Sequence, residues 1–122
     1  MTEESSRPGA RASARAGALR SRRYEELVAK VKAAVLESPG RLEPSVRRAI
    51  ASRETAGVPD ALRAYADKVA LHAYKVTDAD IEGLLRAGFS EDEIFEVTAS
   101  AALGAALARL ERGLAVLEES AR

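Results

Sequence analysis

The sequence contains no cysteine, no tryptophan and a single histidine, His72. Without cysteine the chain has no thiolate nucleophile, no redox-active dithiol and no thiolate ligand for a metal ion. A single histidine also excludes a two-histidine metal site within one chain, including the paired Glu-x-x-His pattern of di-iron bundles. We therefore expect no metal ion or other cofactor.

Aromatic residues are scarce as well, at 4% of the 122 residues. A core built mainly from Ala, Leu and Val suits closely packed helices better than strands. No segment has the pattern of a strand, so a Gly-rich phosphate loop that follows a strand is not expected either. The sequence predicts an all-α protein, a bundle of about five helices with a long C-terminal helix.

The chain also lacks an apolar run near the roughly 20 residues that span a bilayer, and its first residues lack the apolar stretch of a signal peptide. We therefore expect a cytoplasmic protein that does not act at a membrane. Residues 1–21 are rich in Arg, Ser and Gly and have almost nothing to bury, which predicts a disordered basic tail. Residues 22–122 are predicted to form a single helical domain.

Apolar residues recur at helical spacing over residues 22–37 and again over residues 59–75, and Pro44 opens a short helix between them. The helix over 59–75 carries Leu62 and Tyr65 on one face and Leu71 on the opposite face. A helix with apolar residues on both sides is usually covered on both sides, by another element or by another subunit.

Two capping boxes mark the starts of the following helices, Thr77–Asp80 for the first and Ser90–Glu93 for the second. Gly88 is placed to end the first of these helices in a left-handed conformation. The acidic residues around both starts complement the helix dipoles and require no catalytic role.

The last predicted helix runs from residue 91 to about residue 118 and carries two stripes. One is a packing seam with steps of three and four residues, made of Phe95, Ala99, Leu103, Leu107, Leu110, Leu114 and Leu117. The other consists of small residues: Ala101, Gly104, Ala105, Ala108 and Ala115. Because glycine inside a helix costs about 1 kcal/mol relative to alanine, we expect another helix to approach Gly104 closely.

His72 is the one side chain that titrates near neutral pH by default, and it lies at the flank of the apolar face formed by Tyr65 and Val69. It is a candidate general base, with the hydroxyl groups of Tyr65 and Tyr74 as candidate proton donors. The alternative is structural: a boundary histidine bonded to backbone or water, and two tyrosines that pack in the core or at an interface.

Residues 76–117 resemble the AhpD-like alkylhydroperoxidase and carboxymuconolactone decarboxylase superfamily. The resemblance rests on Val76-Thr77-Asp78, on Ala87-Gly88-Phe89-Ser90, on Glu93-Ile94 and on the Ala-rich helix that follows. It covers about a third of the chain well. It implies an all-helical fold and a homo-oligomer, often a trimer or a hexamer.

In the peroxidase branch of that family, a Cys-x-x-Cys pair followed by histidine precedes the Ala-Gly turn. By the resemblance, these three positions fall near Ala73, Val76 and Asp80, so none of the three reactive residues is present. His72 lies eight residues before the expected histidine position and inherits no role. The decarboxylase branch works without the cysteine pair and uses a histidine for acid–base catalysis.

Three functions stay open at this point. The first is a non-thiol, AhpD-like helical protein that serves as an oligomeric binding subunit or as the partner of a related enzyme subunit. The second is a cofactor-independent, decarboxylase-like enzyme that uses His72 as its acid–base group. The third, which we rank last, is association with nucleic acid through the Arg-rich tail.

Overall fold

The computed structural model describes residues 22–120 of the chain. The chain divides into two compact units, Met1–Ala34 and Val35–Arg122, and each is considered by itself. The predicted basic tail, residues 1–21, lies outside the described residues. No helix within residues 22–120 combines the length and the apolarity needed to cross a lipid bilayer.

In the first unit, residues 22–32 form an α-helix. Its largest apolar side chains, Tyr24, Leu27 and Val31, are each about half exposed. The chain then passes into a wider π-helical turn, η1 (Ala33–Glu37), in which Leu36 is buried. The structure thus confirms the helix expected over residues 22–37.

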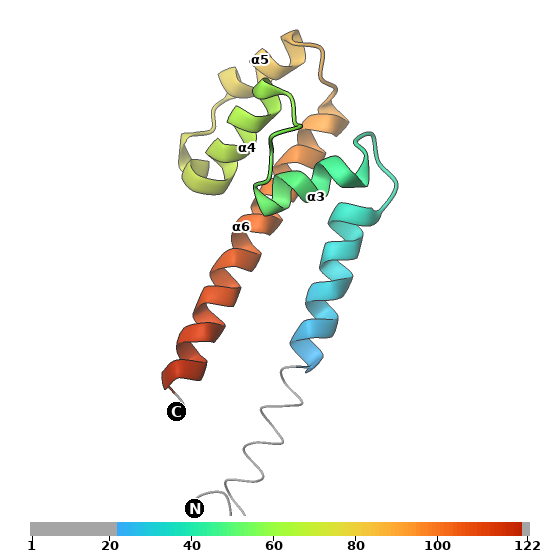
Figure 1. Cartoon of the computed structure of the whole chain (residues 1–122). Coiled ribbons are helices and arrows are strands. Elements are labelled where there is room, and N and C mark those ends of the chain that lie inside the picture. The colour runs from blue at the N-terminus through green and yellow to red at the C-terminus, as the bar shows by residue number, and fades with distance from the viewer. Residues whose placement is uncertain (1–21, 121–122) are drawn as a thin grey trace, which may run out of the picture. The chain divides into compact units, whose positions relative to one another are not determined.

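The second unit continues with α3 (Pro44–Ser52), α4 (Asp60–His72), the 3₁₀ turn η2 (Ala73–Lys75), α5 (Asp78–Arg86) and α6 (Glu91–Ser120). Residues 22–120 contain no strand, so the all-α fold with a long C-terminal helix is confirmed. The helix expected over residues 59–75 is α-helical only over α4, and its last turn is the tighter 3₁₀ turn η2. Figure 1 shows α3 and α4 beside the first half of α6, whereas the second half extends past them.

The helix boundaries follow the capping signals in the sequence. Thr77 and Asp80 form a reciprocal capping box at the start of α5, and Ser90 and Glu93 form another before α6. Gly88 has a positive φ of 101°, and its N–H and that of Phe89 bond back to the last turn of α5. This is a Schellman motif, which satisfies carbonyl groups that the end of a helix leaves without partners.

The core lies between α3, α4, α5 and the first half of α6. It consists of Ile50, Val58, Leu62, Tyr65, Ala66, Leu84, Ile94, Val97 and Ala101. The core face of α6 is therefore the one with Val97 and Ala101, and Phe95, from the predicted packing seam, is 71% exposed. The packing seam is not the face through which α6 joins its own core.

Gly104 explains why the small-residue stripe, rather than the seam, faces the core. A Cβ atom built on Gly104 would lie 2.1 Å from the carbonyl oxygen of Ala51 in α3. Only glycine permits this approach of the α3 backbone, and the close packing offsets the helix propensity that glycine costs. The expected close approach at Gly104 is confirmed, and the helix that makes it is α3 of the same chain.

Candidate functional site

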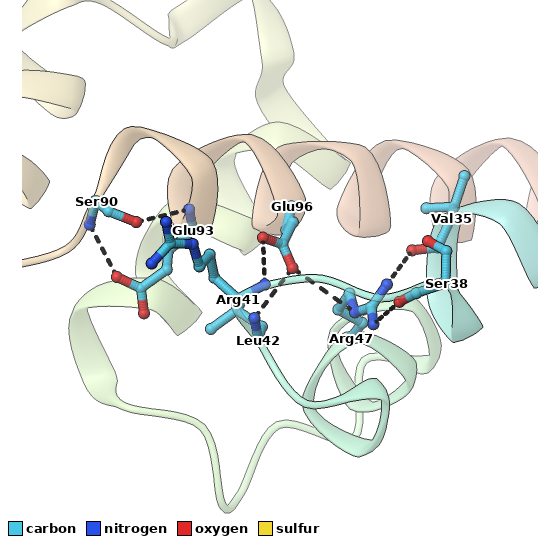
Figure 2. A network of polar contacts seen from close by, with 8 residues as sticks. All are labelled: Val35, Ser38, Arg41, Leu42, Arg47, Ser90, Glu93 and Glu96. Carbon is cyan, nitrogen blue, oxygen red and sulfur yellow. Dashed lines mark hydrogen bonds and ion pairs between the residues drawn. The ribbon is translucent and has the colours of Figure 1, made fainter.

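Arg47 of α3 is the most deeply buried charged residue among residues 22–120, with 2% of its surface exposed. Its Nη1 donates to the carbonyl oxygen of Val35 at 2.9 Å, and its Nη2 donates to that of Ser38. Val35 lies in η1 and Ser38 directly follows it, so both carbonyls lie at the C-terminal end of a helix, where a cation is favoured by the dipole. Figure 2 shows the guanidinium between these carbonyls and the carboxylate of Glu96 on α6.

Glu96 balances that charge and also holds a loop. Its Oε1 lies 3.9 Å from Arg47 Nε and accepts the backbone N–H of Leu42 at 3.0 Å, while its Oε2 accepts that of Arg41 at 2.9 Å. A Cβ on Gly40 would come within 2.3 Å of the same carboxylate, so glycine lets the loop lie against it. These contacts bind the loop before α3 to α6.

This cluster is a structural clamp, because its hydrogen bonds and its ion pair join parts of the same chain. A buried charge is tolerated only when it is paired and hydrogen-bonded, and Arg47 meets this condition. Its Nε has no hydrogen-bond partner, and neither does the buried Ser100 Oγ one turn after Glu96 on α6. Sequence reasoning missed the clamp, because nothing in the sequence shows that Arg47 and Glu96 are close.

The three predicted catalytic side chains do not meet in one place. His72 is the last residue of α4 and is exposed, and its ring lies 6.1 Å from that of Tyr74 in an edge-on arrangement. Tyr74 is 81% exposed. Tyr65 is buried in the core instead, and its hydroxyl lies 2.8 Å from Thr98 Oγ1 on α6.

The positions that the family resemblance assigns to reactive residues have local structural roles here. Ala73 opens η2, and Val76 directly follows it. The Asp80 carboxylate accepts a hydrogen bond from the Lys68 ammonium at 2.9 Å and one from the backbone N–H of Thr77. These bonds, the one from Lys68 above all, lower the pKa of Asp80 and keep it ionised.

Within residues 22–120, no group of three or more His, Asp or Glu side chains is arranged to hold a metal ion. Leu71 near the end of α4 and Tyr74 in η2 are both exposed. Within residues 22–120 no element covers the second side of this helix, and cover by another subunit stays a prediction.

The second half of α6 carries a row of leucines outside the core. We call the five leucines of the predicted packing seam the leucine seam: Leu103, Leu107, Leu110, Leu114 and Leu117. None of them is buried, and the last three are 44%, 40% and 65% exposed. No residue of α6 after Ala101 is buried, and beyond the contact of Gly104 with α3 residues 105–120 extend over about 24 Å without a core.

Comparison with known proteins does not supply an identity. No protein-family model, curated protein or solved structure matches the chain significantly. The function is therefore inferred from the geometry of the chain itself.

Proposed function

We propose that this protein acts by helix–helix association, as an oligomeric binding subunit or as the partner of another helical subunit, and that the leucine seam is its contact surface. The observation that supports this proposal is the exposed seam on a helix that has no buried residue after Ala101. Leucines spaced by three and four residues form the contact stripe of paired helices.

The physical argument concerns the stability of this half-helix. The second half of α6 buries no residue, and most helical stability in proteins comes from packing of an apolar face. Burying the exposed part of each seam leucine would contribute roughly 1 kcal/mol. A partner helix therefore stabilises the second half of α6 and is itself bound.

The catalytic alternative has less support from the geometry. General acid–base catalysis needs its groups within hydrogen-bond reach of one substrate. The hydroxyl of Tyr65 is already hydrogen-bonded to Thr98 inside the core, while His72 and Tyr74 are exposed at the end of α4. The AhpD-like resemblance, with its trimers and hexamers, agrees with an associating subunit and stays a prediction.

The test compares Leu114→Glu with Val116→Glu in the full chain. The two side chains are 40% and 42% exposed and lie about 200° apart around α6, so the variants match in chemistry and exposure but differ in face. Two assays are used: sedimentation over a range of protein concentration, and binding of a designed amphipathic peptide with a leucine seam bordered by glutamine.

We expect the intact chain to self-associate, to bind the peptide, or both. Leu114→Glu should abolish the self-association or peptide binding that the intact chain shows, and Val116→Glu should preserve it. Circular dichroism should show that both variants keep the helical fold. A chain that sediments near its monomer mass of 13.0 kDa at every concentration and binds no peptide contradicts the proposal. So does equal behaviour of the two variants.

A further inference from the structure

The leucine seam has two chemically different borders. On one side lie Glu111 and Glu118, each placed one helical turn after a seam leucine. On the other side the border is uncharged, with Ala106, Gly113 and Ser120. The side of a helix next to an apolar seam is where charged residues select the partner helix.

Both border carboxylates are available to a partner. Glu111 and Glu118 are exposed, and neither forms a salt bridge with any other residue in the described part of the chain. By contrast, Glu96 on the first half of the same helix is held by the loop before α3 and by Arg47. Within residues 22–120, the acidic border therefore has no ion pair that would explain its charge.

We propose, on the basis of the proposed function, that the partner of the leucine seam is an amphipathic helix whose own apolar stripe is bordered by Lys or Arg. Opposite charges along the border of two paired helices favour one partner and disfavour others. A basic border places cations beside Glu111 and Glu118. An acidic border places like charges there instead.

The same reasoning argues against an antiparallel pair formed by two copies of α6. In an antiparallel pair the same border of each helix faces its counterpart, so the glutamates of both copies meet along one side. Like charges at neighbouring positions on helices are destabilising. A different helix with a basic border fits the charge pattern better.

The experiment measures binding of two labelled synthetic peptides to the full chain by fluorescence anisotropy. The peptides share one leucine seam and differ only in their border residues, which are Lys in one and Glu in the other. Each is tested against the intact chain, against Glu118→Lys and against Glu119→Lys. Glu119 is the matched control because it carries the same charge but lies about 200° from Leu117, on the opposite side of α6.

We expect the Lys-bordered peptide to bind more tightly, with Glu118→Lys weakening it by roughly fivefold and strengthening the Glu-bordered peptide. Glu119→Lys should leave the preference intact, and raised salt should reduce it. Equal binding of both peptides, or a preference that Glu118→Lys does not change, overturns the basic partner. In that case peptide binding that Leu114→Glu abolishes still supports the proposed function.

Self-association supplies the remaining readout if the seam is already occupied and neither peptide binds. Because the purified protein contains only copies of this chain, the helix that occupies the seam then belongs to a second copy. A basic helix of that copy predicts that Glu118→Lys weakens the assembly seen by sedimentation, whereas Glu119→Lys does not. An antiparallel pair of α6 helices predicts the opposite, since removing acidic charge from its shared acidic border strengthens that pair. Strengthening or no change therefore overturns the basic partner. If Leu114→Glu keeps both peptide binding and assembly, the proposed function itself is contradicted.

Discussion

Two glycines on α6 offer a test in which the same substitution has opposite effects. Gly104 faces the backbone of α3, and a Cβ there would lie 2.1 Å from the oxygen and 2.7 Å from the carbonyl carbon of Ala51. Gly113 has no heavy atom within 4 Å of its Cβ position. Helix propensity alone predicts that alanine stabilises the helix by up to about 1 kcal/mol at either position.

At Gly104 the steric cost exceeds that gain. Ordinary contacts begin near 3.4 Å, so the last turn of α3 has to retreat by roughly 1 Å, and Ile50, which precedes Ala51, is part of the core. Overpacking of this kind costs about 1–3 kcal/mol. We expect Gly104→Ala to lower the free energy of unfolding by about 1–2 kcal/mol, and Gly113→Ala to raise it by about 0.5–1 kcal/mol.

Thermal and urea unfolding followed by circular dichroism, at low protein concentration, measure both changes. For a domain of this size the two variants should differ in Tm by about 10 °C. A Gly104→Ala variant as stable as the parent, or a shift of both variants in the same direction, would refute the reasoning. It would show that α3 does not approach α6 at Gly104 as described.

Three further substitutions test the polar contacts. Glu96→Gln leaves the buried Arg47 without a counter-charge, and urea unfolding should show a loss of about 1–3 kcal/mol; an unchanged midpoint would mean that the carbonyl groups alone compensate the guanidinium. The pKa of Asp80 is lowered, chiefly by Lys68, so the stability it contributes is present above its ordinary value of 3.8 and is lost as pH falls through the lower folded pKa. Unfolding measured from pH 6 down to pH 2 should therefore decline less steeply in Asp80→Asn, and parallel curves would contradict this. Tyr65→Phe removes a hydrogen bond inside the core and should cost about 1 kcal/mol in thermal unfolding, and an unchanged Tm would mean that this bond contributes no net stability.

Local signals in the sequence determined the helices and their boundaries. The capping boxes at Thr77 and Ser90 and the left-handed end at Gly88 are short-range hydrogen-bond patterns, which depend only on neighbouring residues. The absence of cysteine likewise excluded thiol chemistry without any knowledge of the fold. The sequence also placed the leucines of α6 on one stripe, since helical spacing fixes which residues share a face.

Only the tertiary structure decided which stripe faces the core. Both stripes of α6 are apolar, and the choice depends on α3, whose backbone comes close enough to require Gly104. The same packing brings Arg47 to Glu96, a pairing across 49 residues of sequence that no local pattern predicts. The tertiary structure also buries Tyr65 in the core and leaves His72 and Tyr74 at the surface. Helical spacing predicts which residues share a face, but it does not predict which other element packs against that face. The leucine seam is apolar because of its sequence. It is exposed because α3 packs against the opposite stripe of α6, so that no element of the second unit covers the seam.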